Sequence, residues 1–75
     1  MSVSFEPGHI RLVYRDRTAT LGSALEDNEI VIELDQLTHW DAPDEAIEVT
    51  LEDIMAITQM IEAEADRLGL DVAFA

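Results

Sequence analysis

The feature that most restricts the fold of this chain is a stretch near the C-terminus, Leu51–Leu68, that carries a single, mainly apolar stripe. The stripe residues recur at spacings of three and four, the period of an amphipathic α-helix, and they are Leu51, Ile54, Ile57, Thr58, Ile61, Ala65 and Leu68. Thr50 can act as the N-cap, and Asp53 can complete a capping box with it. Gly69 can take the positive φ that commonly ends a helix. The pattern predicts one helix over residues 51–68, about 27 Å long.

Much of the remaining chain alternates between apolar and polar residues, as β-strands do. Residues 29–34 show this alternation most clearly. Residues 15–17 interrupt it and are predicted to form the tight turn of a hairpin, and residues 22–23 predict a bend. Pro43 lies in a predicted loop because it cannot donate a ladder hydrogen bond. Strands are expected at residues 9–14, 18–21, 29–34 and 70–74, with a further short edge strand at 46–49.

One helix with one apolar stripe is suited to covering one face of a small sheet. We therefore expect a two-layer α+β fold, in which a small antiparallel sheet of four to five strands is covered on one face by a single C-terminal helix. The 75 residues, 48% of them hydrophobic, suffice for one core and one acidic domain, residues 1–75. The other sheet face would carry a mixture of polar and apolar side chains, suited either to partner contact or to ordinary exposure to solvent: Arg11, Val13, Val31 and Glu33.

The charge of the chain narrows the class of partner. The formal net charge is −13, there is no Lys, and neither Lys nor Arg occurs between Glu26 and Asp66. Such a field repels nucleic acid and anionic membranes and attracts a basic protein. The alternative is that the acidity serves only solubility. The basic cluster Arg11, Arg15 and Arg17 is expected to pair with nearby acids.

The location expected from the sequence is the cytoplasm. The first residues lack the basic start and apolar run of a signal peptide, and no apolar run approaches the roughly 20 residues that span a bilayer. The chain has no Cys, which excludes disulfides and thiolate metal sites.

A search for catalytic chemistry assigns no catalytic residue, cofactor or metal ligand. The sequence has no nucleophile elbow and no phosphate-binding glycine loop. Paired carboxylates need a closed pocket for acid–base catalysis, which a domain of this size rarely builds. Asp35, His39 and Asp41 can cluster and bind a metal weakly, but a solvated His39 is the favoured interpretation. We therefore expect a protein that is not an enzyme, with a small metal-binding domain as one alternative.

Trp40 is the single Trp and lies in a polar loop between His39 and Asp41. Large aromatic side chains are mostly buried, which favours the interpretation that Trp40 folds back to close the core beside Pro43. Trp is also enriched among the residues that dominate binding energy at interfaces. The alternative interpretation, in which Trp40 is a binding anchor, is therefore kept.

One pattern runs along the chain through Ile10, Tyr14-Arg15-Asp16, Ile30-Val31-Ile32-Glu33-Leu34-Asp35, His39-Trp40-Asp41-Ala42-Pro43, Ile54, Ile57, Ile61 and Leu68-Gly69-Leu70-Asp71-Val72. This pattern resembles the immunity protein 74 family, small bacterial immunity proteins of polymorphic-toxin systems. The resemblance covers nearly the whole chain, and its most specific element is the Trp-Asp-x-Pro loop before the helix. The chain departs from the pattern in the hairpin turn, where residues 15–17 stand where Gly is expected.

The resemblance implies a protein that binds a cognate toxin and blocks its active site, and it brings no catalytic residues. Many toxins of this kind are nucleases with basic clefts, in which an acidic surface can take the place of phosphates. A self-assembling module, a homodimer paired through the edge strand at residues 70–74, is the other alternative. The predicted contact residues for a basic toxin domain are Glu33, Asp35, Trp40, Asp41, Asp44 and Glu45.

Overall fold

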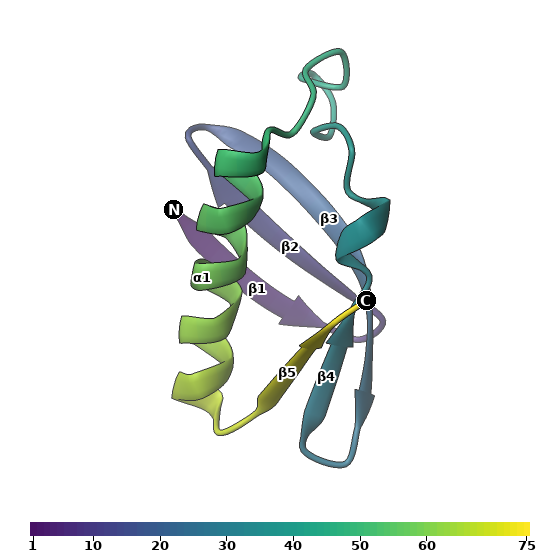
Figure 1. Cartoon of the computed structure of the whole chain (residues 1–75), viewed down its shortest axis with the longest axis vertical. Coiled ribbons are helices and arrows are strands. Elements are labelled where there is room, and N and C mark those ends of the chain that lie inside the picture. The colour runs from purple at the N-terminus through teal and green to yellow at the C-terminus, as the bar shows by residue number, and fades with distance from the viewer.

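The computed structural model covers all 75 residues and contains a five-stranded sheet and one α-helix (Figure 1). The predicted α+β class, with a single C-terminal helix packed on the sheet, is confirmed. A short 3₁₀ helix, η1, follows the fourth strand. In chain order the elements are β1 (Ser2–Glu6), β2 (His9–Tyr14), β3 (Arg17–Glu26), β4 (Glu29–Ile32), η1 (Leu34–Gln36), α1 (Leu51–Leu68) and β5 (Asp71–Phe74).

The strands lie in the order β1-β2-β3-β4-β5, and β1 to β4 form an antiparallel meander. The prediction of a wholly antiparallel sheet is wrong for the last pair, because β5 runs parallel to β4. The reason lies in the connection between the two strands. Parallel neighbours need a long crossover, usually a helix, and α1 supplies it here. The sheet is therefore mixed.

Strand β1 was not predicted, although its sequence alternates. Val3 and Phe5 are half-buried against the core and pair with Leu12 and Ile10 of β2. The intervening serines face solvent. The strand at residues 46–49 was predicted but is reduced to one β-bridge between His39 and Glu48. The predicted strand at 29–34 ends at Ile32 because Leu34 begins η1.

Strand β3 continues through the position where a bend was expected and joins the two halves of the sheet. Its first half pairs with β2, and from Ser23 onward it pairs with β4. Gly22 lies at the change of partner, where a Cβ atom would collide with the carboxylate of Glu33. In the predicted tight turn before β3, Arg15 and Asp16 have φ angles of 52° and 62°. Positive φ at both central residues is the mark of a type I′ hairpin turn, so the turn forms without Gly.

Helix α1 has the predicted bounds and caps. The Asp53 amide donates to Thr50 Oγ1 at 3.2 Å, and the Thr50 amide donates to Asp53 Oδ2 at 3.1 Å. Gly69 ends the helix at φ 75°. The predicted stripe is buried only in its middle, because Leu51 and Leu68 are 76% and 47% exposed at the two helix ends.

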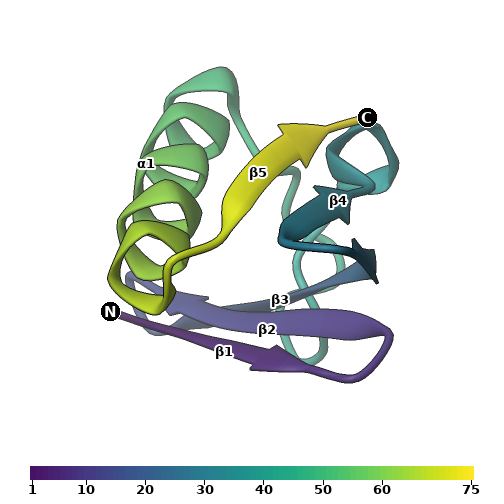
Figure 2. The same ribbon diagram turned by 90° about the horizontal axis from the view of Figure 1, so that it is seen from below.

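The core lies between the curled sheet and α1, which contacts both edge strands, β1 and β5 (Figure 2). Burial of apolar side chains in this single cluster is the main favourable term in folding. No helix here has the length and apolar character that a membrane crossing requires. The core cluster consists of Ile10, Leu12, Ala19, Leu21, Ile30, Ile32, Trp40, Ile57 and Ile61.

Candidate partner-binding surface

The predicted contact residues lie on two segments that follow one another along one side of the molecule (Figure 1). Glu33 and Asp35 lie at the end of β4 and in η1. The other four, Trp40, Asp41, Asp44 and Glu45, lie in the loop between η1 and α1, residues 38–49, which we call the acidic loop.

The acidic loop is held by hydrogen bonds of its own backbone. The Trp40 amide donates to the Ile47 carbonyl at 3.2 Å, and the Val49 amide donates to the Thr38 carbonyl at 2.9 Å. The Ile47 amide donates in turn to the Asp44 carbonyl at 2.9 Å. These bonds close the loop on itself, so its carboxylates are displayed by an ordered backbone.

Asp41 ties the acidic loop to strand β3. Its amide donates to the Thr18 carbonyl at 2.8 Å, and its Oδ2 accepts from Thr20 Oγ1 at 2.7 Å. Asp41 is half-buried. It therefore positions the loop in addition to carrying charge.

Trp40 is 2% exposed and belongs to the core. Its ring stacks on Tyr14 with centroids 6.4 Å apart and an angle of 17° between the ring planes. The indole Nε1 is buried without a hydrogen-bond partner. This placement agrees with the interpretation that Trp40 closes the core, and it leaves the ring out of reach of a partner in this conformation.

The expectation that the basic cluster pairs with nearby acids is wrong. Arg67 is the one Arg in an ion pair. The Arg15 guanidinium lies 5.3 Å from the Tyr14 ring centroid, and that of Arg17 lies 6.0 Å from the Trp40 ring centroid. Aromatic faces attract cations through the ring quadrupole, and the hairpin turn places both side chains beside these rings. The acids of the loop are thus left without internal cations.

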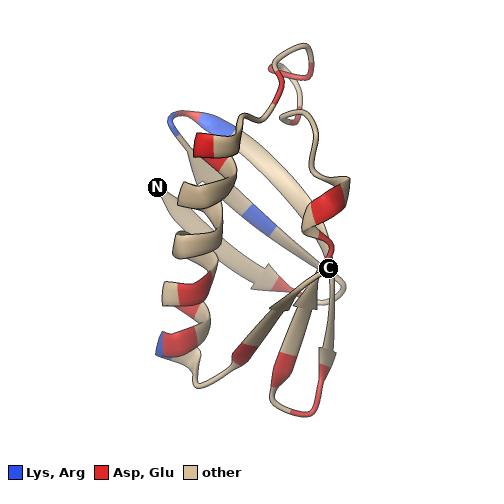
Figure 3. Ribbon diagram, in the orientation of Figure 1, with Lys and Arg blue, Asp and Glu red and all other residues tan.

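The carboxylates of the predicted set are free of ion pairs. Glu33, Asp35 and Glu45 are exposed, and Asp44 is half-buried. Neither these four residues nor Asp41 takes part in an ion pair. Figure 3 shows acidic residues along the acidic loop and η1. The Arg residues of the β2–β3 hairpin turn appear in this view near the N-terminal end of α1.

Two further residues at this surface were missed. The Asp35 amide donates to the Ala75 carbonyl at 3.0 Å, which brings the C-terminal residue beside η1. No local signal in the sequence indicates this contact, because it depends on the parallel pairing of β5. Glu48, exposed and paired with His39 across the loop, was also left out of the set. Its place in a run of loop acids was the available signal.

The structure does not assemble a metal site. Asp35, His39 and Asp41 are not brought together, and no group of three His, Asp or Glu side chains has the spacing to hold a metal ion. His39 Nδ1 lies 3.1 Å from Thr38 Oγ1. The metal-binding alternative therefore loses the cluster on which it depended.

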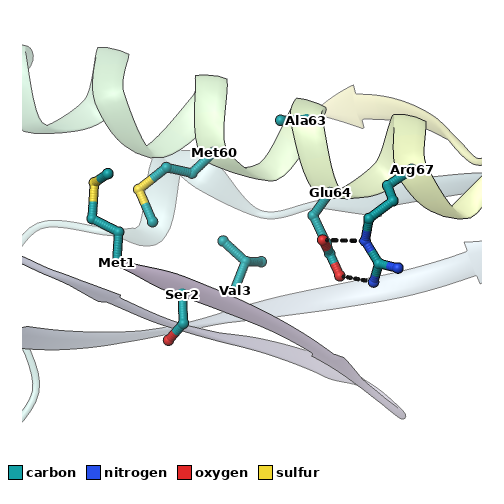
Figure 4. Close-up of a pocket in the computed structure, with 7 residues that line it drawn as sticks. All are labelled: Met1, Ser2, Val3, Met60, Ala63, Glu64 and Arg67. Carbon is teal, nitrogen blue, oxygen red and sulfur yellow. Dashed lines mark hydrogen bonds and ion pairs between the residues drawn. The ribbon is translucent and has the colours of Figure 1, made fainter.

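A surface hollow between β1 and α1 contains the single Arg–carboxylate ion pair (Figure 4). Arg67 Nε and Nη2 donate to Glu64 Oε1 and Oε2 at 2.9 and 2.6 Å. The hydrogen bonds from Arg67 lower the pKa of Glu64 below its ordinary value of 4.5, and the positive charge adds to this effect. Met1 and Met60 form the other end of the hollow. This pair stabilises the last turn of α1. It includes no residue of the acidic loop, so it does not neutralise the negative charges of the loop.

The fold and surface together define a small two-layer α+β domain whose ordered loop displays carboxylates that lack internal cations. Residues 2–75 match the family model described as immunity protein 74, and the chain belongs to this family. The resemblance seen in the sequence is confirmed. No curated protein and no solved structure matches the chain.

Proposed function

We propose that the protein neutralises a cognate toxin domain by binding it and blocking its active site, without chemistry of its own. The observation that supports this proposal most strongly is the excess of unpaired carboxylates. Of the 17 acidic residues, all but Glu6 and Glu64 lack an ion-pair partner. Membership of a family of immunity proteins supports a cognate toxin as the partner.

A basic toxin domain is the partner that such a surface fits. The net charge of −13 speeds the encounter with a cationic partner and disfavours nucleic acid and anionic membranes. A toxin that binds nucleic acid carries a basic cleft in which carboxylates can take the place of phosphates. The protein would act in the cytoplasm of the cell that it protects.

The proposed contact surface comprises Glu33, Asp35, Asp44 and Glu45, with Asp41 and Trp40 holding the loop in place. The hydrogen bond from Thr20 fixes Asp41, and the stack on Tyr14 fixes Trp40. A loop held in this way loses little conformational entropy on binding, which favours affinity.

Calorimetry with the toxin domain encoded beside the gene tests the proposal. The variant Asp35→Asn/Glu45→Gln removes two charges from the surface, and Glu62→Gln/Asp66→Asn removes two from exposed positions of α1. We expect the first variant to weaken binding roughly tenfold and the second by about twofold at most. Absence of binding by the unmodified protein would contradict the proposal, and equal weakening by both variants would contradict the assigned surface.

Self-association through an edge strand remains a second candidate because β5 does lie at the edge of the sheet. The strand is only four residues long, and two copies would each bring a charge of −13. We therefore expect light scattering to find a monomer. A dimer that dissociates when Val72→Pro removes a ladder donor would support the second candidate.

A further inference from the structure

The face of the sheet that points away from α1 carries a charged surface of its own over strands β1, β2 and β3 (Figure 2). Along β2, Ile10 and Leu12 are buried in the core, whereas Arg11 between them is exposed and points to the opposite side. Its register partners, Ser4 on β1 and Thr20 on β3, share this side. Arg11 therefore lies near the centre of this surface, which we call the outer face.

Two acids from beyond β3 reach the outer face. Asp41 Oδ2 accepts from Thr20 Oγ1 at 2.7 Å, so this carboxylate lies beside the register partner of Arg11. Gly22 is two residues from Thr20 and shares its side of the strand. The carboxylate of Glu33 lies over Gly22, in the space that a Cβ atom would occupy. The proposed contact surface for the toxin therefore continues onto the outer face, where it meets Arg11.

The Arg11 guanidinium has no partner within the protein. It takes part in no ion pair and donates no hydrogen bond, and it lies over no aromatic ring, unlike Arg15 and Arg17. A hollow of about 220 Å³ lies beside it, so its donors have room for an acceptor. The lining of this hollow is formed by Ser2, Ser4, Glu6, Arg11, Val13 and Thr18.

A free guanidinium at this position restricts what can cover the outer face. A partner that places basic groups on Glu33 and Asp41 also covers Arg11, which is one strand away from them. A guanidinium in a protein keeps its charge, and covering a charge without an opposite charge is costly. The partner must therefore bring an acceptor to Arg11, and a carboxylate is the group that matches the planar fork of donors.

We propose that Arg11 determines partner specificity by binding a carboxylate of the toxin domain, one that lies among the basic groups facing Glu33 and Asp41. The partner is the toxin domain of the proposed function, on which this inference rests. A partner that is basic throughout would set like charges against each other at Arg11. The net charge of the protein attracts any basic protein, whereas this contact distinguishes among them.

Arg11→Gln tests the inference, because net charge and specific contact predict opposite results for this variant. Loss of a positive charge makes the protein more acidic, so attraction of a basic partner alone would tighten binding. We expect toxin binding to weaken by about tenfold or more, through faster dissociation, since the approach to a basic partner is not slowed. Arg11→Lys keeps the charge but not the planar fork and should fall between the two.

Arg67→Gln is the matched control, because it removes the same charge at the end of α1, away from the outer face. We expect it to change toxin binding by about twofold at most. Toxin binding that is equal or tighter in Arg11→Gln would overturn the inference and leave the proposed function intact.

A pair of peptides tests Arg11 without the toxin. Lys-Gly-Glu-Gly-Lys has a central carboxylate, whereas Lys-Gly-Gln-Gly-Lys lacks it and is the more positive of the two. We expect the first to bind about threefold more tightly or better, with saturable NMR shifts at Arg11 Nε and at the amides of Ser4 and Thr20. Equal binding of the two peptides, or shifts that do not include Arg11, would overturn the inference. Failure of the unmodified protein to bind toxin would overturn the proposed function, and the peptides would still decide the role of Arg11.

Discussion

At the scale of single residues, Trp40 shows how distant contacts decide a role that neighbours leave open. His39 and Asp41 are polar, so the local sequence is compatible with an exposed anchor as well as with a core residue. The stack on Tyr14, a residue of β2, shows that Trp40 is a core residue. The same stack holds the acidic loop against the sheet, which links the core to the proposed contact surface.

Shortening Trp40 should destabilise the protein according to how much of the ring is removed. Trp40→Ala leaves a cavity and should cost about 3–5 kcal/mol of unfolding free energy. Trp40→Phe keeps an aromatic ring and removes the unpaired indole N–H, so it should cost about 1–2 kcal/mol. Urea unfolding followed by circular dichroism measures both values. Equal costs for the two variants would contradict the packing described for this ring.

The Glu64–Arg67 pair predicts a pH effect at one residue. Because Arg67 lowers the pKa of Glu64 in the folded state, the pair stabilises the fold above the ordinary pKa of 4.5. That contribution is lost as the pH falls through the lower folded-state value. NMR titration should find the Glu64 midpoint below 4.5, returning toward 4.5 in Arg67→Gln. An unchanged midpoint in the variant would show that Arg67 is not the cause.

At the scale of elements, local signals predicted α1 completely, whereas the sheet was predicted only in part. Thr50, Asp53 and Gly69 act within one turn of the helix ends, so sequence alone fixes the helix bounds. The direction of β5 and the place of the C-terminus beside η1 depend on pairing between segments far apart in the chain. The acidic segments of the proposed contact surface were visible in the sequence. The placement of Arg15 and Arg17 over aromatic rings, without an ion pair to any acid, was not.

The capping box should account for a measurable part of the stability of α1. Asp53→Ala removes the carboxylate that accepts from the Thr50 amide, and it should lower the unfolding free energy by about 0.5–2 kcal/mol. Glu52→Ala is the control, because Glu52 also lies in the first turn but makes no capping bond. Chemical denaturation of both variants gives the comparison. A loss in Glu52→Ala as large as in Asp53→Ala would assign the effect to the helix dipole alone.

At the scale of the whole molecule, negative charge acts over the entire fold. The radius of gyration is 11.7 Å, while the screening length is about 30 Å at 0.01 M salt and about 3 Å at 1 M. At low salt every carboxylate therefore interacts with the others, and the fold carries a repulsive term that a basic partner would relieve.

Reducing the repulsion should stabilise the protein at low salt only. Glu29→Gln removes the central charge of the row that Glu29 forms across the sheet with its register partners Glu26 and Asp71. We expect a gain of about 0.2–1 kcal/mol at 0.01 M salt and almost none at 1 M. Urea unfolding at the two salt concentrations measures the difference. The same gain at both would point to strand propensity and not to charge.

Titration of toxin activity tests the central claim, that the protein acts by affinity and not by chemistry, most directly. Increasing amounts of the protein are added to a fixed amount of the toxin domain encoded beside the gene, and the residual toxin activity is measured. We predict a linear fall that reaches zero at equal amounts of the two proteins, with activity recovered when high salt separates them. Complete inactivation by a small fraction of an equivalent, or full activity in the presence of excess protein, would contradict the account.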